Sequence, residues 1–299
     1  MNLQELNRIN GIAGAVEFIE GRGGLPTAIL HSTHAEAVVC LYGAQVLSYS
    51  PKGLRDLLWM SGNSEFQQGK PIRGGIPVCF PWFGPHVSDP KKPQHGFARL
   101  QLWTVAGASV YADGTVELRL SLSDNEETHA LWPYAFAAEV VIRVGTDLDV
   151  TLRCTNTGTE AFTYTDALHS YFAVSDIGNV KISGLQGTEY YFGTATDSQP
   201  QQEEHLKIRQ EENRRYIETS ADCVIHDAAV PGPIRVAKRG SRVTVVWNPW
   251  KETAKQISDM PDEGYKTMIC VEAVNAYGDA VTLQPGATFN LGTTIIAMQ

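Results

Sequence analysis

The sequence lacks the features of secreted, membrane-spanning and disulfide-rich proteins. Its five cysteines are odd in number, scattered and never arranged as Cys-x-x-Cys, which argues against a disulfide framework and a structural zinc site. No stretch approaches the ~18 uninterrupted apolar residues of a membrane span. The first residues lack a basic stretch followed by an apolar run, so no secretory signal is expected. These absences predict a cytoplasmic protein with buried free thiols at Cys40, Cys79, Cys154, Cys223 and Cys270.

Basic residues are outnumbered, with 24 lysines and arginines against 33 aspartates and glutamates and a net charge of −9. An acidic surface repels nucleic acids and anionic membranes, so neither is expected as a partner. A small anionic substrate is not excluded, since a few arginines in one cleft can outweigh the average field of the surface. We expect a small-molecule partner and a monomer or weak homodimer.

Helical patterns are weak, whereas alternation of apolar and polar residues is common. Val116–Leu122 predicts one half-buried strand, and Ala138–Val144 and Leu148–Cys154, joined by a Gly145–Asp147 turn, predict a hairpin. Further strands are expected at Ala161–Thr165, Val243–Trp247, Thr267–Val271 and Phe289–Ala297. Short strands separated by turn residues favour an all-β sandwich or barrel.

The charged stretch 201–215 fits either one or two helical turns or an irregular loop. No internal repeat, low-complexity tract or Pro/Ser-rich linker marks a domain boundary. Large all-β folds routinely reach this length, so one domain over residues 1–299 is the simpler expectation.

Four segments place polar side chains in apolar, aromatic or glycine-rich surroundings. They are 71–84 with Arg73, 93–99 with Gln94, His95 and Arg99, 166–172 with His169, and 268–273 with Glu272. Each has an ordinary structural interpretation. An arginine beside Gly-Gly can bond loop carbonyls, a histidine among aromatics can be a satisfied core residue, and a glutamate at a strand end can face solvent. Trp82 and Phe83 fit a sugar-stacking wall and a core position equally well.

Taken together and in this order, these residues resemble the aldose 1-epimerase (galactose mutarotase-like) superfamily, and most closely its hexose-6-phosphate 1-epimerase branch. The matching runs are RGGIPVCFPWFG, PQHGFAR, ALHSYFAVSDI, VVWNPW and MICVEA, which span residues 73–273. Runs of this length are more specific than one short motif. The resemblance implies a large antiparallel β-sandwich (a supersandwich) with few short helices. It also implies an isomerase that interconverts the α and β anomers of glucose 6-phosphate or a similar hexose 6-phosphate.

By residue-to-residue carry-over, the resemblance makes Glu272 the general base and His169 the general acid. His95 is expected to contact the sugar. Arg73 and Arg99 are expected to bind the 6-phosphate, with Gln94 adding a polar contact to the sugar or its phosphate.

One position departs from the family pattern. Members commonly carry an aspartate three residues before a tyrosine, and here Asn213 precedes Tyr216 at that spacing. Asparagine donates and accepts hydrogen bonds but carries no charge. We expect Asn213 to contact substrate, and the sequence leaves open whether it changes the substrate preference or the rate.

The residue types suit anomerisation. Opening a hemiacetal removes a proton from the C1 hydroxyl and delivers one to the ring oxygen, and reclosure reverses both transfers. No electron or group is transferred, so neither a cofactor nor a metal is expected. We also expect Val271 and Leu168 to desolvate the pair and raise the pKa of Glu272.

Three alternatives stay open at the sequence level. An epimerase of unphosphorylated aldoses would need only one of the two arginines, and a non-catalytic sugar-phosphate sensor would be expected to lack Glu272 or His169. A metal site at His95, His169 and Glu272 would need more compact ligand spacing than the chain shows.

Overall fold

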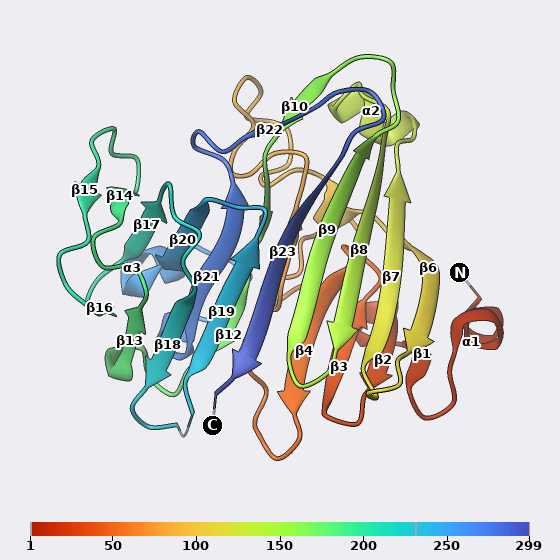
Figure 1. Ribbon diagram of the computed structural model, residues 1–299, viewed down its shortest axis with the longest axis horizontal. Coiled ribbons are helices and arrows are strands. Elements are labelled where there is room, and N and C mark those ends of the chain that lie inside the picture. Colours follow the sequence, from red (N-terminus) through yellow and green to blue (C-terminus); the bar gives the residue numbers. More distant parts are fainter. Residues whose placement is uncertain (1, 231, 299) are drawn as a thin grey trace.

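The computed structural model describes residues 2–230 and 232–298, and antiparallel β-sheets make up most of their regular secondary structure. The largest sheet has nine strands in the order β16-β13-β18-β19-β23-β9-β8-β7-β6 (Figure 1). Its bounds are β6 Thr104–Val110, β7 Val116–Ser123, β8 Phe136–Val144, β9 Leu148–Asn156, β13 Val180–Ser183, β16 Leu206–Lys207, β18 Cys223–Asp227, β19 Ile234–Arg239 and β23 Thr288–Ala297.

Two smaller sheets pack against the largest one. The eight-stranded sheet has the order β15-β14-β17-β20-β21-β11-β5, with β12 also paired to β21. Its bounds are β5 Val78–Cys79, β11 Asp166–Leu168, β12 Tyr171–Ala173, β14 Glu189–Phe192, β15 Gln199–Pro200, β17 Glu212–Tyr216, β20 Val243–Asn248 and β21 Met268–Asn275. The four-stranded sheet contains β1 Val16–Glu20, β2 Pro26–His31, β3 Ala35–Cys40 and β4 Gln45–Pro51. A separate pair joins β10 Phe162–Tyr164 to β22 Val281–Leu283.

The layers form a sandwich. Strand β3 packs against β8 of the nine-stranded sheet, while β21 packs against β19 and β23 (Figure 1). Alternate residues of each strand point into the shared core, as the period-two sequence pattern requires. In β8 and β9, for example, Val140, Ile142 and Leu152 are almost fully buried. Each such side chain contributes about 1.5–3 kcal/mol to folding by leaving water.

Helices are few and short. They are α1 Leu3–Asn10, α2 Glu126–Leu131 and α3 Trp250–Ala254, with 3₁₀ turns η1 Arg22–Gly24, η2 Ala98–Leu100, η3 Ile177–Asn179 and η4 Gly264–Thr267. Asn125 and Thr128 form a reciprocal capping box that fixes the start of α2. Among the described residues, no helix combines the length and apolar character that crossing a membrane requires.

Most sequence-predicted strands are confirmed. The hairpin of β8 and β9 turns where expected, and Val116–Leu122 lies within β7. The stretch 201–215 contains no helix but the two strands β16 and β17, because β17 finds partners in β14 and β20 that no local pattern reveals. All five cysteines are free and buried, as predicted.

The eight-stranded sheet offers two different faces. Val271 and Ala273 of β21 point into the main core of the sandwich. Since successive side chains of a strand point to opposite faces, Glu272 between them points to the other side. On that side, Val243 and Val245 of β20 form a small separate apolar cluster. This second face carries the candidate site.

Candidate active site

The seven sequence-predicted site residues line one cavity of about 350 Å³ over the second face of the eight-stranded sheet. Strands β17, β20 and β21 supply its floor, and the segments around Arg73, His95 and Arg99 supply its walls. The lining residues are Arg73, Phe83, Gly84, Pro85, Gln94, His95, Arg99, His169, Tyr171, Asn213, Val245, Trp247, Ile257, Glu272 and Tyr277. Residues separated by as many as 204 positions in the chain, from Arg73 to Tyr277, therefore meet in one place.

The pairing of β21 with two consecutive strands brings His169 to Glu272. Leu168 of β11 pairs with Ala273, and Tyr171 of β12 pairs with Cys270. The intervening His169 and Ser170 interrupt the ladder opposite Glu272. His169 Nε2 lies 3.5 Å from Glu272 Oε1, longer than a good hydrogen bond. Only 8% of the histidine and 2% of the glutamate are exposed.

Burial opposes charge on both members of this pair. It raises the pKa of Glu272 well above the usual carboxyl range. It also lowers the pKa of His169 to about 3, with further lowering by the positive charges of Arg99 and Arg73. Burial therefore favours the protonated form of the carboxyl and the neutral form of the imidazole. Perturbed groups facing each other in a cavity are typical of acid–base sites.

The expected source of this desolvation was wrong. Val271 and Leu168 belong to the main core, on the opposite face of the sheet from the pair. Neighbours in sequence point away from each other along a strand, so the shielding comes from other elements. Tyr171 stacks on the His169 ring at 4.7 Å between centroids, and Trp247 meets the same ring edge-on at 6.0 Å.

His95 is held by a strained loop beside the pair. Its backbone has a positive φ of 63°, and its amide donates to the carbonyl of Gly84. Nδ1 of its ring accepts a hydrogen bond from the Gly84 amide, so Nε2 carries the ring proton. Burial, followed by the charge of Arg99, lowers its pKa well below the ordinary value. His95 thus enters the cavity as a neutral hydrogen-bond donor.

Arg73 is fixed in place by an aspartate. Its Nε donates to Asp259 Oδ1 at 2.5 Å, and its Nη1 donates to the Tyr171 hydroxyl at 3.2 Å. Burial alone would lower the guanidinium pKa, but the neighbouring Tyr171 and Asp259 raise it above the usual value. Arg73 therefore keeps its positive charge at the cavity, with Nε and Nη1 committed to its two neighbours.

Arg99 stands beside Gln94. One guanidinium nitrogen, Nη2, donates to the Gln94 backbone carbonyl at 2.7 Å. Within the described residues, its buried Nε has no hydrogen-bond partner. Burial lowers the Arg99 pKa from its usual value, an indication that its charge is incompletely compensated.

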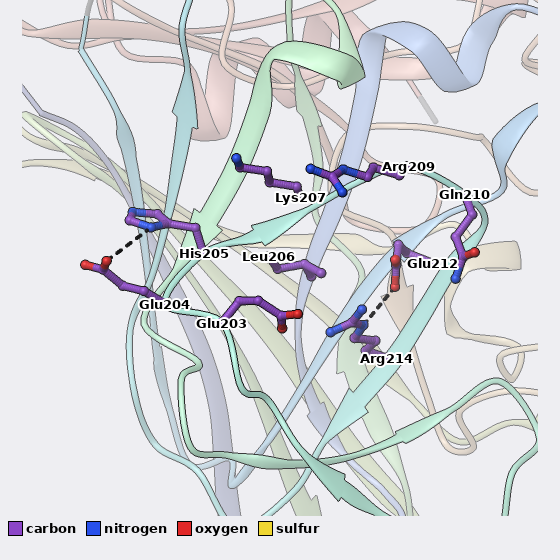
Figure 2. Close-up of a pocket in the computed structure, with 9 residues that line it drawn as sticks. All are labelled: Glu203, Glu204, His205, Leu206, Lys207, Arg209, Gln210, Glu212 and Arg214. Atoms are coloured by element: carbon purple, nitrogen blue, oxygen red, sulfur yellow. Dashed lines mark hydrogen bonds and ion pairs between the residues drawn. The ribbon is translucent and has the colours of Figure 1, made fainter.

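Asn213 reaches the cavity from β17, where it pairs with Trp247 of β20. Its neighbours Glu212 and Arg214 point to the opposite face and join each other at 2.9 Å. They line a different hollow of about 510 Å³, shown in Figure 2. There Arg214 also donates to the buried Gln201, so these charges fasten the strand that presents Asn213.

Some lining residues had little or no sequence signal. Tyr171 and Trp247 lie inside the family-like runs, but only the stacking geometry shows their place at the site. Asp259 lies in a loop after α3 with no motif around it, 186 positions from its partner Arg73. The aromatic pair 82–83 divides: Phe83 lines the cavity, whereas Trp82 is in the core and donates to the Pro93 carbonyl.

Comparison with known proteins identifies the family. The model of the family described as aldose 1-epimerase matches residues 27–295, nearly the whole chain. The chain belongs to the aldose 1-epimerase family. It is therefore an epimerase, an isomerase of sugars, and its fold is the galactose mutarotase-like sandwich. The fold class and the family resemblance expected from the sequence are both confirmed.

Two relatives of this chain come from different organisms. It is 36% identical over 258 residues to a Salmonella typhimurium protein, with 84% of each chain covered. It is 34% identical over 280 residues to a Cenchrus ciliaris protein, covering 90% of this chain and 84% of the relative. Both relatives bear the name "Putative glucose-6-phosphate 1-epimerase".

Solved structures agree on the fold. A Salmonella typhimurium protein described as a "putative mutarotase" superposes with a TM-score of 0.89 at 31% identity, covering 97% of this aldose 1-epimerase and 96% of the other chain. A galactose mutarotase-like protein from Lactobacillus casei gives a TM-score of 0.74 at 16% identity, with 90% and 99% covered. The sandwich thus persists where most of the sequence has changed.

Proposed function

We propose that this epimerase acts on a hexose 6-phosphate, with glucose 6-phosphate as the leading candidate. One observation carries the proposal: two guanidinium groups and the His169–Glu272 pair share a single cavity of about 350 Å³. The family supplies the reaction type, and the two arginines select an anionic substrate. The names of the two relatives above support the same substrate.

The spacing of the pair suits a hemiacetal. The C1 hydroxyl oxygen and the ring oxygen of a pyranose are bonded to the same carbon, so both proton-transfer sites lie side by side. Glu272 Oε1 and His169 Nε2, 3.5 Å apart, can each face one of them. Glu272 removes the proton from the C1 hydroxyl, while His169 protonates the ring oxygen and the C1–ring oxygen bond breaks. Rotation about C1–C2 and the reverse transfers then give the other anomer.

Binding of the phosphate changes the pKa of His169 and thereby the position of the proton in the His169–Glu272 pair. In the empty cavity, Arg99 and Arg73 help to hold the His169 pKa low. A bound phosphate dianion offsets both charges and so raises that pKa. The proton shared by the pair then moves towards His169 and leaves Glu272 as the carboxylate. Substrate binding thereby produces the protonation state that ring opening requires.

The arginines suit a phosphate better than a neutral sugar. A guanidinium offers a planar fork of donors that matches two phosphate oxygens. Arg73 has two of its nitrogens committed to Asp259 and Tyr171, and Arg99 has one committed to Gln94. The remaining donors converge on the cavity, where a dianion compensates two buried cations. His95 Nε2 and Asn213 remain for sugar hydroxyls.

Two-dimensional exchange NMR tests the substrate class. Cross-peaks between the α and β anomers are measured with and without enzyme for glucose 6-phosphate, glucose and galactose. The proposal predicts the largest acceleration, as kcat/KM, for glucose 6-phosphate. Equal or greater acceleration of the free sugars would show an epimerase of unphosphorylated aldoses. Binding of the phosphosugar without acceleration would show a sugar-phosphate sensor.

A further inference from the structure

A group of metal-ligand types lies at the cavity, where two of its three members, His169 and Glu272, are lining residues and the third, Cys270, is buried beside them. His169, Cys270 and Glu272 are all buried, and one ligand atom from each lies within 4.8 Å of the other two. Across residues 2–230 and 232–298, no other set of three or more histidine, cysteine or acidic side chains is this compact. The set differs from the one considered from the sequence, since Cys270 takes the place of His95.

The sheet geometry explains the grouping. Cys270 and Glu272 are two residues apart on β21, so their side chains point to the same face. His169 comes from the break between β11 and β12, directly opposite. Strand pairing thus holds a thiol, an imidazole and a carboxylate on adjacent strands without help from a flexible loop.

The group also has unused bonding capacity. Within the described residues, Glu272 Oε2 and His169 Nδ1 are buried without a hydrogen-bond partner. Buried polar atoms normally find partners, so an exception indicates a missing ligand or water. Acid–base chemistry accounts for one oxygen of Glu272 and one nitrogen of His169. It assigns no role to the thiol of Cys270.

We propose that His169, Cys270 and Glu272 form an inhibitory site for a borderline-soft divalent cation of the Zn²⁺ or Cd²⁺ type. Sulfur, nitrogen and oxygen donors together are the ligand set that Zn²⁺ accepts. Tetrahedral coordination with bonds of about 2.0–2.3 Å places ligand atoms roughly 3.3–3.8 Å apart. The 3.5 Å between His169 Nε2 and Glu272 Oε1, the two atoms that also transfer protons, already meets this requirement, and the 4.8 Å limit leaves the thiol a small movement. The fourth position faces the cavity and takes water.

Charge balance is compatible with a divalent ion. On binding, the Cys270 thiol and the Glu272 carboxyl each release a proton to solvent, so two negative ligands meet two positive charges. Arg73 and Arg99 in the same cavity oppose the cation, which weakens the site relative to a dedicated structural zinc centre. The ion occupies the proton-transfer groups, so metal and substrate exclude each other.

A Co²⁺ titration of the full-length protein tests the site without relying on activity. A thiolate bound to Co²⁺ gives a near-ultraviolet charge-transfer band, which the wild type is expected to show with one equivalent of metal. Cys270→Ala and the near-isosteric Cys270→Ser should lack the band. Cys223→Ala, which removes another buried thiol on a different sheet, should keep it. No band in the wild type, or the same band in either folded Cys270 variant, would overturn the proposal.

The inhibitory role rests on the proposed function and has its own readout. Zn²⁺ should inhibit anomer exchange of glucose 6-phosphate competitively, with recovery after addition of a chelator. The Cys270 variants should remain active and need at least about tenfold more Zn²⁺ for half inhibition, because loss of a direct ligand costs no less than loss of a supporting contact. Equal Zn²⁺ sensitivity in Cys270→Ser and wild type would contradict the site. Absent activity in every form would instead contradict the proposed function, and the Co²⁺ spectrum would still decide the metal site.

Discussion

At the scale of single residues, the account depends on where charge is placed and what compensates it. The cavity is lined by two guanidinium groups, two histidines and one carboxyl. Arg73 pairs with Asp259 and His169 lies 3.5 Å from Glu272, whereas Arg99 has no carboxylate partner among the described residues. An uncompensated buried charge is costly unless a ligand neutralises it. We therefore expect the negative charge of a bound substrate, rather than another side chain of the fold, to compensate the positive charge in the cavity.

The arginines should separate phosphorylated from free sugars. Arg73→Ala and Arg99→Ala are each expected to raise KM for glucose 6-phosphate by at least about tenfold, since a charge-assisted hydrogen bond contributes roughly 1.5–3 kcal/mol. KM for glucose should change much less. Steady-state exchange rates over a range of both sugars give the two values. Equal changes for both sugars would contradict a phosphate role.

Asp259 should act through Arg73. Asp259→Asn keeps the shape but weakens the bond to Arg73 Nε. We expect a rise of about two- to tenfold in KM for the phosphosugar, with kcat nearly unchanged, because the reacting atoms are untouched. Asp262→Asn, an exposed aspartate in the same loop, is the matched control. A fall in kcat with no change in KM would rule out this positioning role.

At the scale of elements, the chain crosses the site through backbone conformations that few residues tolerate. Gly96 has a φ of +74°, and a Cβ there would lie 2.1 Å from the Phe80 carbonyl oxygen. The close approach lets the Phe97 and Ala98 amides bond that oxygen, which fixes His95 and Arg99 beside the 80–84 segment. Glycine is thus a requirement of the wall of the cavity.

Gly96→Ala should consequently be destabilising. We expect the free energy of unfolding to fall by about 2 kcal/mol or more, from a strained φ and a clash with backbone. Gly53→Ala measures the cost of the strained φ alone, because Gly53 has a φ of +78° with no atom within 4 Å of the added Cβ. Urea unfolding of both variants makes the comparison. Similar losses in the two would show that the contact at Phe80 is not rigid.

Element-level features divide into those that sequence reveals and those that it hides. Alternation identified β7, β8 and β9 because each strand has one face in the core. It missed the role of β17, Glu212–Tyr216, because both faces of this strand carry polar side chains. Asn213 faces the cavity, and Glu212 and Arg214 form a buried ion pair on the other face. The interruption at His169 and Ser170 depends on how two strands share β21, which is a property of pairing rather than of local composition.

The candidate site shows the same limit. Six of its seven predicted residues came from long family-like runs, and Asn213 came from the position that departs from the family pattern; the cavity contains all seven. Their roles stay predictions. The sequence did not indicate Asp259, because its contact with Arg73 joins two irregular segments. The desolvation of Glu272 was assigned to the wrong side chains, because sequence neighbours on a strand point to opposite faces.

At the scale of the whole molecule, burial of titratable groups makes stability depend on pH. Burial raises the pKa of Asp166 from 3.8 to about 7. A raised carboxyl pKa stabilises the fold below pH 4, and this contribution is lost as pH rises through about 7. His169 has the opposite sign: with a pKa lowered from 6.5 to about 3, its contribution is present above pH 6.5 and is lost as pH falls towards 3.

Asp166→Asn should isolate the contribution of Asp166 to the pH dependence of stability. The variant carries no titrating group at this position, so its stability relative to wild type should increase by at least about 1 kcal/mol between pH 5 and pH 8. His169 and Glu272 are present in both proteins and cancel in the difference. Chemical unfolding at the two pH values provides the measurement. A difference that does not vary with pH would show that Asp166 is not protonated in the folded protein.

The central claim is that Glu272 and His169 transfer protons to and from a phosphorylated sugar. Exchange NMR of glucose 6-phosphate with wild type, Glu272→Gln and His169→Asn tests it most directly. The account predicts a loss of at least about 100-fold in kcat for each folded variant, with phosphosugar binding retained. Turnover near the wild-type rate in either folded variant would contradict it.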